Sequence, residues 1–321
     1  MRKDFALCFN DSYSSYAAVT IKSIADTLLK DDDAHVHVIS DGISPRNRRT
    51  LSQVFNNVHF YQVDNDDVFK GVPTSVWSIY TWYRILIPDL LNDIDKVLYL
   101  DCDVLVNKSL DELFLLDMQG VSVAGCLDLC AYNPGVFERL EYDMDKQYIC
   151  AGVLMMNLKR WREKNLAKAI LNYAEKNVAR LSFPDQDAIN YICQDDKIVL
   201  PSKYGVLPPF FINERFIKEH KQEMEILILD PAIIHYAGYA PWSYPKDKSL
   251  HSALWWQAYK SLGLYPLVRY NYILSFVKTI MRICLSYVHV LKPGDKFYYF
   301  DKYYAHRRLN VHTVKKIIEK K

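Results

Sequence analysis

Two aspartates separated by a single residue, Asp101 and Asp103, follow the apolar run at residues 96–100. Both carboxylates can turn to the same side once the chain bends, and they would then repel each other unless a cation lies between them. Carboxylate oxygens suit Mg²⁺ or Mn²⁺, and a neutral imidazole such as that of His235 shifts the preference toward Mn²⁺. Acidic residues after strands are also common in turns that bind no metal, so the pair alone leaves a structural turn open.

Other polar side chains lie where strands are expected to end or helices to begin. In open α/β sheets ligands bind at the carboxyl ends of the strands, so polar residues there are stronger site candidates than polar residues elsewhere. Besides the aspartate pair, the sequence offers Asn10 with Asp11 after the first apolar run, Asp185-Gln186-Asp187 after Pro184, and His235 at the end of an apolar pair. These groups predict one site along one edge of a sheet.

The sheet that would position these residues is predicted by the alternation of short apolar runs with amphipathic segments, which is typical of parallel strands joined by helices. Ser44 and Pro45 mark a helix start, as cap and first-turn proline. Strands are expected at 5–9, 36–39, 58–63, 96–100, 121–126, 149–156 and 232–236, and helices at 14–29, from 45 onward, at 77–87 (ending at Pro88) and at 158–176. The predicted fold class is therefore α/β, with a mostly parallel central sheet and flanking helices.

The run at residues 97–106, which contains the aspartate pair, closely resembles the family 8 retaining glycosyltransferases. This family includes bacterial lipopolysaccharide glucosyl- and galactosyltransferases and glycogenin. The resemblance covers most of residues 5–242, in the family's order: Asn10-Asp11-x-Tyr13, segment 37–42 (HVISDG), Tyr83-Arg84, Asp101-x-Asp103 with segment 109–113 (SLDEL), segment 151–158 (AGVLMMNL), Asp185-Gln186-Asp187, and His235-Tyr236-x-Gly238. It implies a GT-A fold, a UDP-sugar donor and a Mn²⁺ or Mg²⁺ ion held by Asp101, Asp103 and His235.

The resemblance also implies where the donor would bind. Asn10 and Tyr13 would face the uridine, although Tyr13 could equally be a core aromatic residue. Asp11, Cys102 and Gly238 lie within the same matched segments and are expected to belong to the donor-binding residues.

Three further residues are expected near the reacting sugar. Arg84 would contact the donor phosphate or sugar, because a guanidinium can bind such oxygens in bidentate fashion; a surface salt bridge is the alternative. Asp185 and Gln186 would lie beside the anomeric carbon as the catalytic candidates. Retention could proceed through an enzyme nucleophile or through attack of the acceptor on the same face, and the residue types leave both routes open.

The sequence departs from the family pattern at two positions. Cys150 stands where many members have asparagine before Ala-Gly-Val, and a thiol cannot make the amide hydrogen bonds to the sugar. The segment from His235 to Trp242 also lacks the lysine expected to contact the diphosphate. Lys246 or Lys248 could take its place, or the metal alone could stabilise the leaving group.

These features predict a retaining hexosyltransferase that moves glucose or galactose from a UDP-sugar to a glycan or lipid-linked saccharide, such as lipopolysaccharide, capsule or another cell-surface glycan. The alternative is a catalytically silent protein of the same fold that binds a nucleotide sugar or a carbohydrate. A nucleotidyltransferase would usually carry a Gly-rich, basic loop after its first strand, and residues 9–12 (FNDS) have no such composition.

Charge divides the chain into two parts. Residues 262–321 carry twelve Lys/Arg, three Asp/Glu and eleven aromatic residues, whereas the preceding 261 residues have a net charge of −7. Basic and aromatic side chains together favour the membrane interface. We therefore predict a catalytic domain at residues 1–255 and a membrane-association segment at residues 256–321 that binds an anionic membrane surface; a nucleic-acid partner is not expected.

The expected location is the cytoplasm, with peripheral association at the inner face of the cell membrane. The seven cysteines are odd in number, lie mostly in apolar runs and contain no CxxC pair, which favours reduced thiols. The first residues turn polar too soon for a signal-peptide core. The most apolar late stretch, 272–290, is interrupted by Lys278 and Arg282 and falls short of a membrane-spanning helix.

Overall fold

The computed structural model describes residues 1–64, 66–74, 78–243 and 250–263, together with 273–274, 276–278 and 280–281. The chain forms two compact units. The first comprises Met1–Gly205 and Ala232–His235, and the second comprises Val206–Pro231 and Tyr236–Lys321. The predicted boundary between residues 255 and 256 falls within helix α11 (Ser252–Ser261), and the proposed extent of a membrane-association segment stays a prediction.

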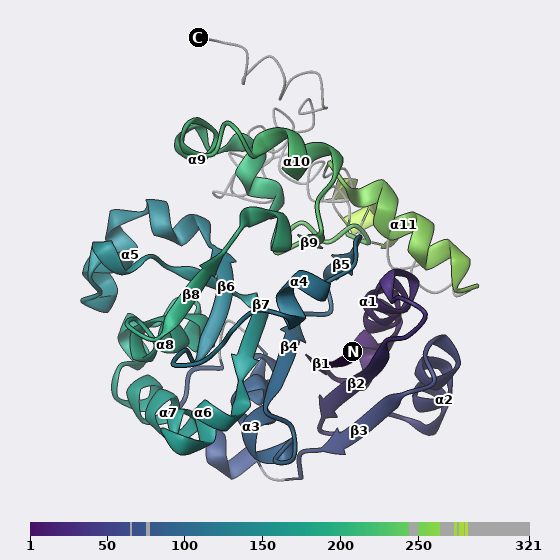
Figure 1. Ribbon diagram of the computed structural model, residues 1–321, viewed down its shortest axis with the longest axis horizontal. Helices are drawn as coiled ribbons and strands as arrows, with labels where there is room; N and C mark the ends of the chain where they lie inside the picture. Colours follow the sequence, from purple (N-terminus) through teal and green to yellow (C-terminus); the bar gives the residue numbers. More distant parts are fainter. Residues whose placement is uncertain are drawn as a thin grey trace. The chain divides into compact units, whose positions relative to one another are not determined.

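The first unit is built on a seven-stranded sheet with the order β3-β2-β1-β4-β7-β6-β8 (Figure 1). Only β7 runs against its neighbours β4 and β6; the remaining pairs are parallel, which confirms the predicted mostly parallel sheet. The strands are β1 (Arg2–Cys8), β2 (Asp33–Ser40), β3 (Val58–Gln62), β4 (Lys96–Leu100), β6 (Val123–Leu127), β7 (Ile149–Asn157) and β8 (Lys197–Leu200). A separate antiparallel pair joins β5 (Val104–Val106) to β9 (Ile233–His235).

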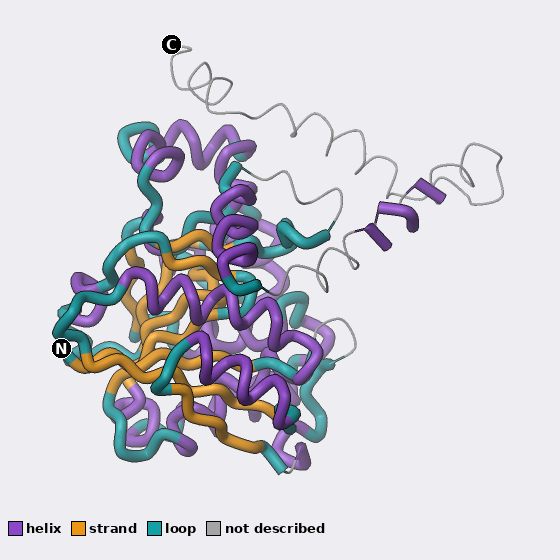
Figure 2. Tube along the Cα trace, turned by 90° about the vertical axis from the view of Figure 1, so that its right-hand side faces the viewer, coloured by secondary structure: helices purple, strands orange, loops and turns teal. Residues whose placement is uncertain are grey.

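Helices cover both faces of the sheet, as expected for strands joined by crossover helices (Figures 1 and 2). One face buries a large apolar cluster that includes Trp82, Tyr99, Trp161, Ile170 and Ile189. The helical segments of this unit are η1 (Asp11–Tyr13), α1 (Ser14–Thr27), α2 (Pro45–Val54), η2 (Asp66–Phe69), η3 (Ile79–Leu86), α3 (Ile87–Leu90), α4 (Asp111–Phe114), η4 (Leu129–Tyr132), α5 (Pro134–Leu140), η5 (Met144–Lys146), α6 (Leu158–Glu163), α7 (Leu166–Lys176), η6 (Val178–Arg180), α8 (Pro184–Ile192) and η7 (Ser202–Tyr204).

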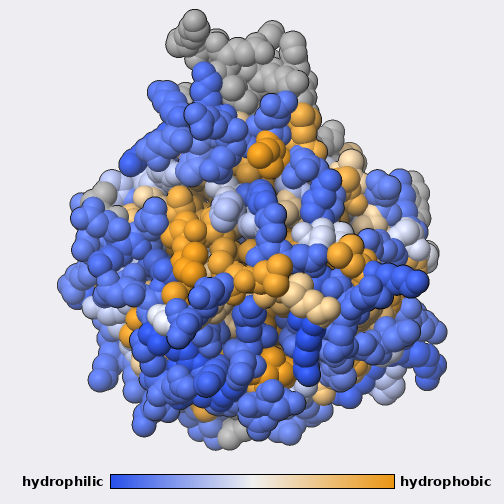
Figure 3. All heavy atoms as spheres, viewed as in Figure 1, coloured by the Kyte–Doolittle hydropathy of each residue, from blue (hydrophilic) through white to orange (hydrophobic). Residues whose placement is uncertain are grey.

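Hydrophilic residues cover most of the face seen in Figure 3, and hydrophobic residues gather near its middle, around α4. Leu115, directly after α4, is 73% exposed. The apolar residues of the strands β1, β4 and β7 are almost all buried, so most of the hydrophobic stabilisation comes from the interior of the sheet layers.

Two sequence predictions of helices were wrong in detail. The helix expected at 158–176 is two helices, because Asn165 between α6 and α7 adopts a left-handed conformation with φ 52°. The helix expected to end at Pro88 is a 3₁₀ helix, η3, and Pro88 instead lies in the first turn of α3. Proline is tolerated there because backbone N–H groups in the first turn have no acceptor within the helix, so the N–H that proline lacks costs no hydrogen bond.

The second unit contains η8 (Pro208–Ile212), α9 (Glu214–Glu219), α10 (Met224–Leu229) and α11. Its core is rich in aromatic pairs, such as Phe210 stacked on Phe216 and Trp255 stacked on Tyr259. Tyr236 Oη donates a hydrogen bond of 2.8 Å to the carbonyl of His251. Among the helices that the structure describes, none has the length and apolar character needed to cross a membrane.

Candidate active site

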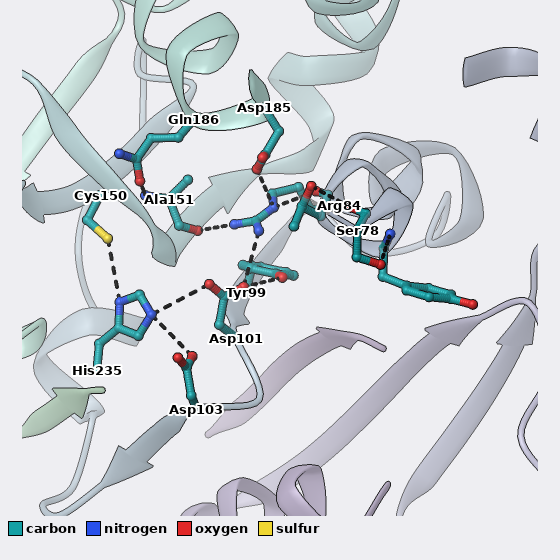
Figure 4. A network of polar contacts seen from close by, with 12 residues as sticks. Ser78, Arg84, Tyr99, Asp101, Asp103, Cys150, Ala151, Asp185, Gln186 and His235 are labelled. Carbon is teal, nitrogen blue, oxygen red and sulfur yellow. Dashed lines mark hydrogen bonds and ion pairs between the residues drawn. The ribbon is translucent and has the colours of Figure 1, made fainter. Parts of the chain in front are cut away.

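The start of β7 joins the polar groups that the sequence analysis singled out (Figure 4). Cys150 Sγ lies 3.5 Å from Nδ1 of His235. The backbone of Ala151 accepts a hydrogen bond from Arg84 and donates one of 2.8 Å to Gln186. The Gly152 carbonyl accepts a hydrogen bond of 2.9 Å from the backbone of Asp101. Three consecutive residues therefore connect elements that are far apart in the sequence.

The antiparallel direction of β7 explains this meeting point. Leu100 at the end of β4 pairs with Val153 near the start of β7. The aspartates that follow β4 consequently lie beside residues 150–152. The pairing of β5 with β9 completes the arrangement, because Val104, directly after Asp103, pairs with His235.

Asp101, Asp103 and His235 form a group of potential metal ligands whose ligand atoms lie within 4.8 Å of one another. His235 Nε2 is 3.2 Å from Asp103 Oδ1 and 3.6 Å from Asp101 Oδ2. The aspartate side chains are 28% and 25% exposed, whereas the imidazole is buried. Burial by itself would lower the pKa of His235, but the neighbouring Asp103 carboxylate and Cys150 together outweigh burial and raise this pKa.

The residues of this group fit a divalent cation. Two carboxylates and an imidazole are a suitable donor set for Mn²⁺ or Mg²⁺. Asp101 and His235 can approach the backbone of β7 this closely because residue 152 is glycine: a Cβ at Gly152 would lie 2.1 Å from His235 Cε1 and 2.6 Å from Asp101 Oδ2. Any side chain at this position would therefore displace two of the three ligands.

Arg84 lies behind the metal ligands and is only 3% exposed. It donates to the carbonyl of Thr81 (2.8 Å) and to Asp101 Oδ1 (3.2 Å), and it pairs with Asp185 Oδ2 at 3.0 Å. Its guanidinium also lies over the Tyr99 ring, 4.3 Å from the centroid. Burial favours the uncharged form, but Asp185, Tyr99 and Asp101 together outweigh burial and raise the pKa of Arg84. The alternative of a surface salt bridge is thus excluded, and contact with a donor stays a prediction.

The first turn of α8 presents Asp185 and Gln186 to the same region. Burial raises the pKa of Asp185, although the Arg84 guanidinium opposes this shift. Gln186 Oε1 accepts from the Ala151 N–H at 2.8 Å, and its Nε2 donates to the Tyr148 hydroxyl at 3.3 Å. The amide is held at both ends, which fixes its orientation.

Asp187, the third member of the Asp-Gln-Asp segment, has a structural role. It is fully buried and accepts hydrogen bonds from Arg139, the Tyr148 hydroxyl and the backbone N–H groups of Ser182 and Phe183. This carboxylate therefore anchors the start of α8 and the loop before it.

The residues expected to contact the uridine lie after β1. Asn10 caps η1 and accepts a hydrogen bond from the backbone of Tyr13. Asp11 accepts hydrogen bonds of 2.8 Å from Ser44 and from Asn47; burial would raise its pKa, but these bonds outweigh it and lower it. Tyr13 is 46% exposed, so it is not a core residue. Burial raises the pKa of the Tyr13 hydroxyl, and the Asp103 carboxylate adds to this rise more weakly.

Two further residues, Cys102 and Gly238, were predicted to bind the donor. The Cys102 side chain is buried, and its carbonyl accepts a hydrogen bond of 3.1 Å from Thr20. Gly238 belongs to the second unit and has φ +70°, a left-handed conformation that favours glycine. Lys246 and Lys248 lie outside the described residues, so the replacement of the missing lysine stays a prediction.

The sequence analysis missed two tyrosines of this site. Tyr99 donates to Asp101 Oδ1 at 2.5 Å, and Tyr148 bridges Gln186 to Asp187. Burial is the main reason why the pKa of each hydroxyl is raised, so both remain hydrogen-bond donors. The position of Tyr99, two residues before Asp101 on a buried strand, was a signal that could have identified it.

Comparison with known proteins agrees with this geometry. Residues 4–246 match the sequence profile of the family described as Glycosyl transferase family 8. The chain is 28% identical over 244 residues to lipopolysaccharide 1,2-glucosyltransferase of Escherichia coli, which covers 73% of this chain and 71% of that protein. It is 27% identical over 266 residues to general stress protein A of Bacillus subtilis (strain 168), covering 76% and 90%.

Solved structures are also similar. The galactosyltransferase LgtC, in complex with donor and acceptor sugar analogues, matches with a TM-score of 0.72 and 27% identity over 80% of this chain and 95% of that chain. A structure of an LgtC active-site mutant, in which glutamine is replaced by glutamate, matches with a TM-score of 0.67 and 26% identity over 78% and 95%. The predicted GT-A fold is confirmed by this likeness.

Proposed function

The chain belongs to glycosyl transferase family 8, and from this membership we propose that it is a metal-dependent, retaining hexosyltransferase. The proposed donor is UDP-glucose or UDP-galactose, and the proposed acceptor is a saccharide or lipid-linked glycan. The similarity to a lipopolysaccharide glucosyltransferase and to a galactosyltransferase supports both sugar candidates.

The observation that carries the proposal is the convergence of Asp101, Asp103 and His235 beside Gly152. These three residues would hold Mn²⁺ or Mg²⁺. When bound, the ion would supply positive charge to the diphosphate of the leaving UDP. Arg84 keeps Asp101 oriented and adds a buried positive charge beside it, so the aspartate is held ready for the cation.

Asp185 and Gln186 are the proposed residues at the reacting face of the sugar. Gln186 is fixed by Ala151 and Tyr148, so its amide can hold the sugar without rearranging. The active-site glutamine named for LgtC supports this assignment. The Asp185 carboxylate is committed to Arg84, and an amide is a weak nucleophile. Both properties favour attack of the acceptor on the same face over a covalent enzyme intermediate.

The test is release of UDP from UDP-glucose and UDP-galactose, measured with and without saccharide acceptors and with Mn²⁺, Mg²⁺ or a chelator. We expect release from one of these donors that needs the divalent ion and increases with a suitable acceptor. Binding of UDP-sugar without any turnover across acceptors would instead favour the silent binding protein.

We also propose that the basic, aromatic segment at residues 256–321 attaches the enzyme peripherally to the inner face of the cell membrane. Residues 273, 274, 276–278, 280 and 281 are helical and exposed, and they are mostly apolar. The twelve basic residues at 262–321 would add attraction to anionic lipids, about 1 kcal/mol for each residue near the surface.

Co-sedimentation with anionic vesicles at low and high salt tests this attachment. We expect binding at low salt that weakens at high salt, and weaker binding to vesicles of neutral lipid. A full chain that stays in the supernatant under every condition would refute it.

A further inference from the structure

Cys150 lies beside the metal ligands but on the opposite side of the imidazole. Its Sγ atom is 3.5 Å from Nδ1 of His235, whereas Nε2 of the same ring faces Asp103 at 3.2 Å (Figure 4). The sulfur therefore cannot share an ion bound at Nε2. It can instead determine which ring nitrogen carries the hydrogen.

The surroundings leave the ring little freedom. Cys150 and His235 are both buried, and Gly152 lies so close that a Cβ there would overlap ring atoms. The backbone of His235 is fixed by its pairing with Val104. Nδ1 consequently lies against sulfur and away from water, where an N–H without an acceptor would be costly.

A neutral imidazole has one N–H and one lone pair. Binding of a cation uses the lone pair of Nε2, so the hydrogen must then be on Nδ1. Histidines that bind metals almost always donate this other N–H to an acceptor, which fixes the ring and its tautomer. Among the residues that the structure describes, the acceptor within reach of Nδ1 is the Cys150 sulfur.

We propose that Cys150 is a positioning residue that accepts the Nδ1–H of His235 and thereby directs Nε2 toward the ion. The inference rests on the proposed metal site. It assigns a role to the residue that replaces the asparagine expected from the family pattern. In this role Cys150 acts through His235 and needs no contact with the sugar.

The test measures Mn²⁺ binding to the full chain, with and without UDP. Binding is monitored as the decrease in the electron paramagnetic resonance signal of free Mn²⁺. We expect Cys150→Ala to weaken binding about 10-fold, the lower end of the effect of removing such a partner. Cys150→Ser should lose less, because a hydroxyl oxygen can still accept the hydrogen. Cys193→Ala is the matched control: Cys193 is equally buried in the same unit but packs in the apolar cluster, so Mn²⁺ binding should be unchanged.

Thermal unfolding would verify that each variant is folded. Binding by Cys150→Ala that equals wild type would overturn the inference, and so would equal losses in Cys150→Ala and Cys150→Ser, or in Cys150→Ala and Cys193→Ala. The metal site itself is checked separately with Asp103→Asn: if this variant binds Mn²⁺ as tightly as wild type, the proposed metal site fails and the inference fails with it.

Discussion

Two neighbouring regions of the active site use carboxylates in opposite ways. At the metal ligands, Asp101 and Asp103 are about a quarter exposed and share one imidazole, so negative charge accumulates at an accessible position. At the start of α8, Asp187 is fully buried and accepts hydrogen bonds from two side chains and two backbone groups. The first arrangement attracts a cation, and the second is complete without one.

The comparison teaches that burial and hydrogen bonding distinguish a ligand-binding carboxylate from a structural one. Arg84 connects the two regions, because it contacts both Asp101 and Asp185. Changes at the metal ligands should therefore affect ion binding and activity with little effect on stability. Changes at Asp187 should lower stability with little effect on ion binding and activity.

The largest effect is expected for Asp103→Asn. Loss of a charged ligand should reduce Mn²⁺-dependent transfer by on the order of 10³-fold, because the ion contributes several kcal/mol to charge stabilisation in the transition state. Steady-state kinetics and urea unfolding would measure activity and stability. The control is Asp26→Asn, at an exposed aspartate of α1 paired with Lys22. Near-normal turnover of Asp103→Asn would contradict the metal assignment.

Gly152→Ala tests the close approach of the β7 backbone to two potential metal ligands. The new Cβ would overlap His235 and Asp101, so we expect Mn²⁺ affinity to fall by about 100-fold, as when a group that orients a ligand is lost. Titration of Mn²⁺ by calorimetry would measure it. Gly135→Ala is the matched control, because a Cβ there meets its nearest neighbour at an ordinary distance of 3.4 Å. Unchanged Mn²⁺ affinity in Gly152→Ala would show that the ligands are not held as described.

Asp187→Asn examines the structural region. Loss of the charge facing Arg139 should lower the free energy of unfolding by about 2 kcal/mol, less than for a fully buried pair because Arg139 is partly exposed. Urea denaturation would measure this loss. In the folded variant, Mn²⁺ binding should remain close to wild type; a stable variant that no longer binds the ion would contradict the contrast between the two regions.

Tyr148→Phe should have the smallest effect. It removes the hydroxyl between Gln186 and Asp187, and the lost hydrogen bonds should lower the free energy of unfolding by about 1 kcal/mol. Because the Gln186 amide is then no longer fixed, kcat should fall about 10-fold while KM changes little. Tyr142→Phe is the control in the same apolar cluster, since its hydroxyl bonds to the carbonyls of Lys146 and Gln147 and not to Gln186. Equal kcat values for the two variants would remove Tyr148 from the positioning of Gln186.

Several elements followed from local patterns. The apolar periodicity of residues 14–29 and the Ser44-Pro45 start correspond to α1 and α2, because capping and helical spacing are local properties. The run at residues 96–100 coincides with β4. Likewise, the Asp-x-Asp pattern, with its family resemblance, singled out Asp101, Asp103 and His235, and the structure brings these three together as potential metal ligands.

What the sequence by itself determined is therefore most of the strands, the aspartate pair and the family; β5 and β8 were not predicted. The tertiary structure decided how they meet. The antiparallel direction of β7 places Cys150, Ala151 and Gly152 against segments up to 85 residues away in the sequence. A local sequence pattern does not predict the direction in which a strand runs in the sheet. The division between partly exposed Asp103 and buried Asp187 likewise could not be seen in the two Asp-x-Asp segments. Burial depends on packing between elements distant in the chain, and this packing leaves one carboxylate partly accessible among potential metal ligands and makes the other an anchor.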